Sequence, residues 1–123
     1  INLAAFKIIK NSPLIGLGTG SSLEALYSEY KKMNFIAGIK QKFNTHNQYL
    51  ENFIELGFLG FIGVILLMII TIKEGLKNKS LLFYTAVGVA FLCLFESFFA
   101  RHHGVAFFAF YIPLFYKFES DKI

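Results

Sequence analysis

Long apolar runs separated by short polar segments dominate the second half of the chain. Leu56 to Ile72 carries no charge, and about 17 such residues are at the short end of what a membrane-spanning helix needs. The preceding stretch from Asn47 is compatible with a helix and contains no proline, which predicts a helix over about residues 47–72. A second uncharged run starts at Ser80 and predicts a helix over about residues 80–100, provided that Glu96 is tolerated.

A third apolar run, Val105 to Tyr116, is only about 12 residues long and contains Pro113. It fits a tilted or thinned span, a re-entrant segment, or a helix that takes in residues from Arg101 onward. We predict a helix over about residues 103–118. The loop over residues 73–79 holds three lysines, and short basic loops stay in the cytoplasm, which orients the first two helices as an antiparallel hairpin.

The first 45 residues have a different pattern and, from the orientation of the hairpin, are expected to lie outside the cytoplasm. Ile1 to Lys10 places Ala4, Ala5, Ile8 and Ile9 on one face, as in an amphipathic helix at a membrane interface. Pro13 ends this helix, and the glycines of residues 16–20 make a turn. Ser22 to Met33 predicts another short helix.

Composition agrees with an all-α, polytopic membrane protein fragment of two to three transmembrane helices. The chain is 55% hydrophobic and only 16% charged, which is too little charge for the surface of a soluble domain of this size. The net charge of +4 resides in loop lysines and indicates anionic head groups or phosphates rather than nucleic acid. A single cysteine, Cys93, excludes a disulfide framework, and the histidine spacing favours no metal site, so no cofactor is expected.

Polar residues gather at the outer end of the first predicted spanning helix. Asn47, Glu51 and Glu55 recur at every fourth position and share one helical face, where a carboxylate should turn toward a partner or a wet cavity. Gly57, Gly60 and the glycine at position 63 form a smooth stripe that would let another helix approach closely.

A second polar cluster comes from the other side of the hairpin. Glu96, Arg101, His102 and His103 follow the second apolar run. Counted at about 1.5 Å per residue from the shared loop, Glu55 and Glu96 should end at a similar depth, just below the outer surface. Arg101 should then meet His46 and Asn47 in one polar pocket.

These motifs together resemble those of the bacterial O-antigen ligase and polymerase family. His46-Asn47, nine residues and then Gly57-x-x-Gly60 are similar to the family's signature. Residues 13–20, with Gly16 and Gly18, are similar to the Pro-Leu-Phe-Gly-Val-Gly-x-Gly element that opens the family's large periplasmic loop. The resemblance therefore implies that residues 1–45 form part of that loop. Glu96-Ser97 with Arg101, followed by an aromatic-rich helix, resembles its closing segment.

The resemblance implies a multi-pass enzyme of the bacterial inner membrane, with this chain as a carboxy-terminal fragment that is inactive alone. Such an enzyme moves a glycan from undecaprenyl pyrophosphate to an acceptor hydroxyl, on a lipid A core sugar, at the periplasmic face. His46 would be the catalytic base, since a neutral imidazole can accept a proton near pH 7. Arg101, and with it Lys40 or Lys42, would bind the pyrophosphate. Asn47 and Glu55 complete the substrate-binding candidates.

Several alternatives stay open. A polymerase or a protein O-oligosaccharyltransferase of the same family would show the same motifs. A transporter subunit could use Glu55, Glu96 and His46 as an ion or proton path, and a non-catalytic membrane module could use them to bind a partner. Singly, Asn47 can be a helix cap, the two glutamates interhelical hydrogen-bond acceptors, and Arg101 an interfacial anchor.

Overall fold

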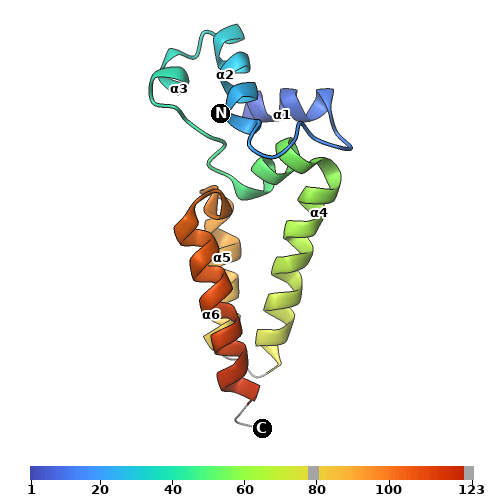
Figure 1. Cartoon of the computed structure of the whole chain (residues 1–123), viewed down its shortest axis with the longest axis vertical. Coiled ribbons are helices and arrows are strands. Elements are labelled where there is room, and N and C mark those ends of the chain that lie inside the picture. Colours follow the sequence, from blue (N-terminus) through green and yellow to red (C-terminus); the bar gives the residue numbers. More distant parts are fainter. Residues whose placement is uncertain (78–80, 121–123) are drawn as a thin grey trace.

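The computed structural model describes residues 1–77 and 81–120, and every regular element in them is helical. Figure 1 shows the short amino-terminal helices gathered at one end of a longer helical bundle, with the amino terminus in that cluster and the carboxy terminus at the far end. This confirms the all-α prediction. The elements are α1 (Asn2–Asn11), α2 (Ser22–Lys32), α3 (Ile36–Lys40), α4 (Gln48–Leu76), α5 (Leu81–Leu92), the 3-10 turn η1 (Phe98–Ala100) and α6 (His102–Ser120).

A small apolar core joins the amino-terminal helices to the start of α4. Ala4, Ala5 and Ile8 of α1 pack against Leu26 and Tyr30 of α2, and Ile54 of α4 completes the cluster. The small side chains of α1 let the helices approach closely, and all six residues are almost inaccessible to solvent. The apolar face that we expected at a membrane interface is therefore buried inside the protein, and Leu3 and Phe6 are the exposed apolar residues of α1.

The long helix α4 is interrupted at Gly57, whose backbone angles (φ 67°, ψ −157°) are not helical. The interruption is held by the loop after α1: the Phe58 amide donates to the Pro13 carbonyl, and the amides of Leu17 and Gly18 donate to the carbonyls of Ile54 and Glu55. These bonds satisfy backbone groups that the bend would leave unpaired. A loop thus takes the place of one helical turn.

The predicted glycine stripe has other roles than helix packing within this chain. Gly57 forms the bend. A Cβ on Gly60 would collide with the Leu56 side chain and come within 2.8 Å of the Asn52 carbonyl oxygen, so this glycine also serves the bend. A Cβ on Gly63 would meet nothing within 4 Å. Gly57 is therefore taken up by the bend, and close packing of another helix at Gly60 and Gly63 stays a prediction.

Two antiparallel helices, α4 and α5, meet near their connection, where Gly75 lies so close to the Phe83 backbone that a Cβ would clash. Lys73 belongs to α4 rather than to a loop, while positions 78 and 79 of the predicted basic loop lie outside the described residues. The predicted continuation of the second helix to Ala100 is also wrong, because α5 ends at Leu92.

Hydrogen bonds from the start of α4 explain the early end of α5. The Cys93 carbonyl accepts a hydrogen bond from the Gln48 amide, and the Leu94 carbonyl accepts one from the Asn47 side chain. Carbonyls at a helix carboxy terminus lack partners within the helix, and here the start of α4 supplies them. The chain then turns through η1 into α6, which covers one more residue at its start and two more at its end than predicted.

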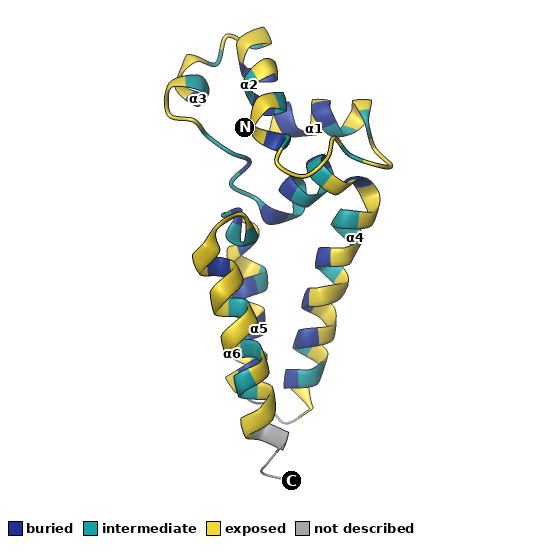
Figure 2. Cartoon of the chain, viewed as in Figure 1, coloured by how far each residue is buried: buried dark blue, intermediate teal, exposed yellow. Residues whose placement is uncertain are grey.

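Among the described helices, α4 is long and apolar enough to cross a membrane, and the apolar helix α5 is shorter, at 12 residues. Figure 2 shows exposed positions over much of α4, α5 and α6, with buried ones mainly where these helices face each other. Many of the exposed side chains are large and apolar, such as Leu66, Ile70 and Phe91. That pattern suits lipid or further protein as the surroundings.

Candidate functional site

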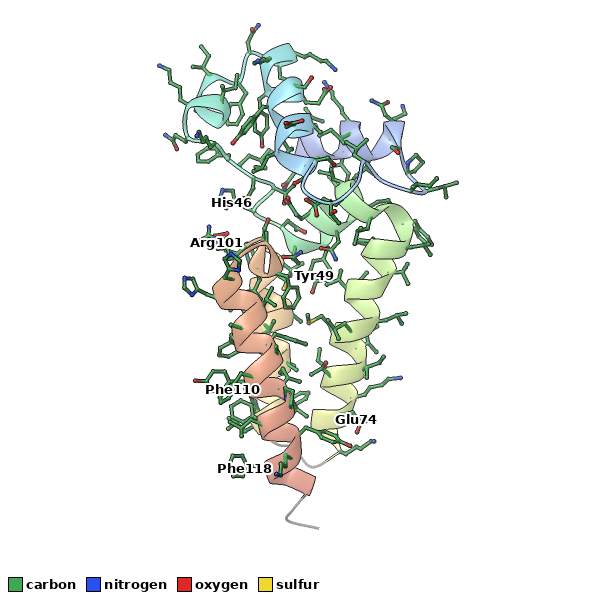
Figure 3. All side chains as sticks on the ribbon, in the orientation of Figure 1. His46, Tyr49, Glu74, Arg101, Phe110 and Phe118 are labelled. Carbon is green, nitrogen blue, oxygen red and sulfur yellow. The ribbon has the colours of Figure 1, made fainter. Side chains whose placement is uncertain are left out.

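His46 lies at the junction between the amino-terminal helices and the bundle, close to Arg101, whereas Glu74 marks the opposite end of α4 (Figure 3). The backbone of His46 is in the left-handed region, with φ 48°. The Asn44 side chain accepts a hydrogen bond from the His46 amide, at 3.0 Å, and the Phe43 ring packs edge-on against the imidazole, with 5.7 Å between ring centroids. A left-handed residue other than glycine is uncommon and tends to occur where function fixes the geometry.

Glu96 connects His46 to Arg101. One carboxylate oxygen lies 3.3 Å from His46 Nδ1, and the other accepts a hydrogen bond from Arg101 Nη2 at 2.8 Å. The three side chains keep 38% to 60% of their surface exposed. The expected meeting of His46 and Arg101 is therefore seen, and a shared carboxylate mediates it. The exposed face of this group is open to a ligand.

Asn47 caps α4. Its side-chain oxygen accepts from the Leu50 amide at 3.0 Å, and its side-chain nitrogen donates to the Leu94 carbonyl at 3.1 Å. The capping prediction is confirmed. The same side chain also fixes α4 to the end of α5, directly beside His46.

Glu55 does not share a site with Glu96. Its carboxylate accepts hydrogen bonds from the Gly20 amide and the Ser22 hydroxyl, each at 3.0 Å. The predicted pairing fails because α5 ends early, so that its last residues lie beside the start of α4: the Tyr49 hydroxyl donates to the Ala90 carbonyl. Glu55 lies further along α4, away from the end of α5, and holds the glycine loop through Gly20 instead.

Glu51 is a buried site residue that sequence reasoning placed on the right face but gave no role. It is 5% exposed, and hydroxyls from three separate segments, those of Ser22, Thr45 and Ser97, surround it. The fourfold spacing of Asn47, Glu51 and Glu55 carried the signal. Which of the three would be buried depends on α2 and on the turn after α5.

The other candidates lie apart from this group. Lys40 ends α3, Lys42 follows it, and both are exposed with no bond to the His46 group among the described residues. His102 and His103 begin α6 and are exposed. No group of three or more His, Cys, Asp or Glu residues in the described part of the chain is arranged to hold a metal ion.

An apolar groove of about 650 Å³ runs from this junction along α4 and α5. Its polar end holds Asn47 and Tyr49, and apolar side chains line the remainder down to Ile72. Phe6 of α1 lies at its edge. The groove is thus an elongated apolar surface whose polar end includes Asn47, the residue after His46.

Comparison with known proteins decides the family. Residues 3–65 match the family model described as O-antigen ligase, which is half of the chain. The chain belongs to the O-antigen ligase family. It is therefore a membrane protein of a glycosyltransferase-type family, and the resemblance inferred from its motifs is confirmed.

The O-antigen ligase match contains His46, Asn47, Glu55 and the glycines of both motifs, whereas Glu96 and Arg101 follow it. The chain is also 31% identical over 70 residues to a protein of Haemophilus influenzae described as uncharacterized. That alignment covers 57% of this chain and 18% of the relative, so the chain spans about a fifth of the relative's length. No solved structure matches.

Proposed function

We propose that this chain is the carboxy-terminal part of a multi-pass inner-membrane glycosyltransferase that transfers a glycan from undecaprenyl pyrophosphate to an acceptor hydroxyl at the periplasmic face. The observation that supports it best is the contact of one carboxylate, Glu96, with both the His46 imidazole and the Arg101 guanidinium. Family membership supports transfer chemistry in general. The lipid A core sugar is the acceptor that we propose.

In this proposal His46 is the general base. When Nδ1 donates to Glu96, the other ring nitrogen, Nε2, is unprotonated and can accept the proton of the acceptor hydroxyl. The acceptor oxygen then bonds to the anomeric carbon while the bond from that carbon to the pyrophosphate oxygen breaks. Glu96 stabilises the imidazolium that forms, as a carboxylate does beside a catalytic histidine.

Arg101 would offset the charge that develops on the departing pyrophosphate. Among the described residues, its contact is that of Nη2 with Glu96, and 60% of the side chain is exposed, so the other guanidinium donors can reach phosphate oxygens. We further propose that Lys40 and Lys42 add positive charge there once the donor is bound, and that Asn47 and Glu55 contribute to substrate binding.

The apolar groove beside the junction suits the polyprenyl chain of such a donor. Placing the His46 group on the periplasmic side and the end of α4 with Lys73 on the cytoplasmic side would align the groove with the bilayer. A polymerase or a protein O-oligosaccharyltransferase would need the same donor site. Loss of the gene should leave long lipid-linked chains unattached in a ligase, and should shorten the chains in a polymerase.

The decisive experiment is His46→Ala in the complete protein, with His103→Ala as the matched control. We expect His46→Ala to lower glycan transfer by about 10²-fold or more, as removal of a general base does, without loss of the protein from the membrane. His103→Ala should transfer normally, because that histidine is exposed and outside the group. Full transfer by His46→Ala would overturn the proposal.

A further inference from the structure

The buried carboxylate of Glu51 sits behind the His46–Glu96 pair, where no role has yet been given to it. It is 5% exposed and forms no ion pair among the residues that the structure describes. Burying a charged group without a cation is costly unless hydrogen bonds compensate. The position therefore calls for an explanation in terms of what the carboxylate holds together.

Three hydroxyls from distant parts of the chain converge on Glu51. Thr45 Oγ1 donates at 2.5 Å, Ser97 Oγ lies 3.3 Å away, and Ser22 Oγ contacts the other carboxylate oxygen. The three residues are 0% to 2% exposed. The carboxylate thus links the loop before α4, the turn after α5 and the start of α2.

Two of these partners are the immediate chain neighbours of the reactive pair. Thr45 precedes His46, Ser97 follows Glu96, and their hydroxyl oxygens are 3.0 Å apart. Any movement of the two backbone segments relative to each other must break this buried contact. The buried side chains of Thr45 and Ser97 therefore restrain the distance between the His46 ring and the Glu96 carboxylate.

We propose that Glu51 is a positioning residue, which acts on transfer through Thr45 and Ser97 by holding His46 against Glu96. The inference rests on the proposed function, since it concerns the geometry of the proposed base. Glu51 itself touches neither substrate nor the imidazole. Ser22 extends the same network to α2, so the periplasmic helices are joined to the site through this carboxylate.

The first part of the test needs no enzymatic activity. In the complete protein, amide hydrogen exchange is compared for Glu51→Gln and for the control Glu24→Gln, an exposed glutamate of α2. We expect Glu51→Gln to speed exchange together in residues 44–48 and 94–98, because the amide nitrogen that replaces one carboxylate oxygen donates instead of accepting, and the three hydroxyls can no longer all be paired. Unchanged exchange in these segments would overturn the inference. If the Glu51→Gln protein fails to accumulate, Ser97→Ala is used in its place, because it removes one hydroxyl of the same network.

The second part is a double-mutant cycle on transfer kinetics. Glu51→Gln should lower kcat about tenfold, with the donor KM unchanged, because misplaced catalytic groups slow the chemical step. Added to Glu96→Gln, it should cost almost nothing more, since the partner that it positions is already altered. An equal loss of kcat in both backgrounds would overturn the inference.

The two proposals fail in different ways. Full transfer by His46→Ala removes the proposed function whatever the exchange data show. Additive effects of Glu51→Gln and Glu96→Gln, with His46→Ala inactive, remove only the positioning role.

Discussion

Gly16 and Gly57 are packed backbone to backbone, and neither could carry a side chain. A Cβ on Gly16 would lie 2.5 Å from the Gly57 nitrogen, and one on Gly57 would lie 2.7 Å from the Gly16 nitrogen. Both have positive φ, 74° and 67°. The two glycine motifs that resembled the family in separate parts of the sequence are therefore one structural unit, which joins the loop after α1 to the bend in α4.

Substitution of Gly57 should disrupt this unit. We expect Gly57→Ala to lower the free energy of unfolding by about 2–4 kcal/mol, since alanine is strained at this φ and its methyl group would strike the Leu14 carbonyl. Gly63→Ala, on the same helix with open space around it, should be neutral or stabilising by up to about 1 kcal/mol. Thermal unfolding of the detergent-solubilised protein measures both, and equal losses would contradict the assignment.

Arg101 should be replaceable by lysine in part only. Arg101→Lys keeps the positive charge but replaces the planar, forked guanidinium with a single ammonium group. That one group must then bind both Glu96 and the phosphate. We expect transfer to fall about tenfold in Arg101→Lys and about 10²-fold in Arg101→Ala, each factor of ten being about 1.4 kcal/mol in the barrier. Initial rates with a purified lipid-linked donor give the comparison. Equal rates for lysine and arginine would assign the residue to membrane anchoring.

Removal of the Tyr30 hydroxyl should stabilise the folded protein. The residue is fully buried in the core of α1, α2 and α4, and its hydroxyl has no hydrogen-bond partner among the described residues. Tyr30→Phe should therefore raise the free energy of unfolding by about 1 kcal/mol. A loss of stability would show that the hydroxyl is satisfied in the complete protein.

The same residue predicts an alkaline effect. Burial, followed by the charges of Tyr27 and Glu51, raises the pKa of Tyr30 above its usual value of 10. The folded state then holds the phenol proton more tightly than the unfolded chain, so stability is complete below pH 10 and declines as the pH rises further. Unfolding curves at pH 8 to 11 should show wild type losing stability against Tyr30→Phe only at the upper end of that range.

The orientation of the hairpin can be tested with single cysteines in a Cys93→Ala background. Thr19 lies in the glycine loop and Lys77 follows α4, and both are exposed. In intact cells, a membrane-impermeant maleimide should label Thr19→Cys and not Lys77→Cys. Labelling of both from one side would refute the proposed placement of His46 on the periplasmic face.

The helices could be predicted from the sequence where a single segment determines its own structure. The apolar run of α4, its cap at Asn47 and the two short amino-terminal helices follow from local pattern and capping chemistry. The bend at Gly57 could not be predicted, because its stability comes from hydrogen bonds to Pro13, Leu17 and Gly18, more than 35 positions earlier. The end of α5 depends in the same way on Gln48.

The site was predictable in its members more than in its connections. His46 and Arg101 were expected together from counting residues along the hairpin, and a shared carboxylate does join them. Glu55 was placed with Glu96 because the counting assumed two uninterrupted helices. Glu51 gained its importance only from Ser22 and Ser97, whose arrival at one point no periodicity reveals.

The bend at Gly57 also sets the length of the straight apolar part of α4. The straight part of α4 after it, Phe58 to Leu76, rises about 28 Å, close to the thickness of a bilayer's hydrocarbon layer. The nine residues before the bend run at a different angle, and Tyr49 among them packs against the apolar cluster that includes Val64 and Met68 of the straight part. In the proposed orientation, a thicker membrane would shift the lipid boundary relative to the imidazole, and the proposed transfer should therefore vary with the length of the host's fatty acids.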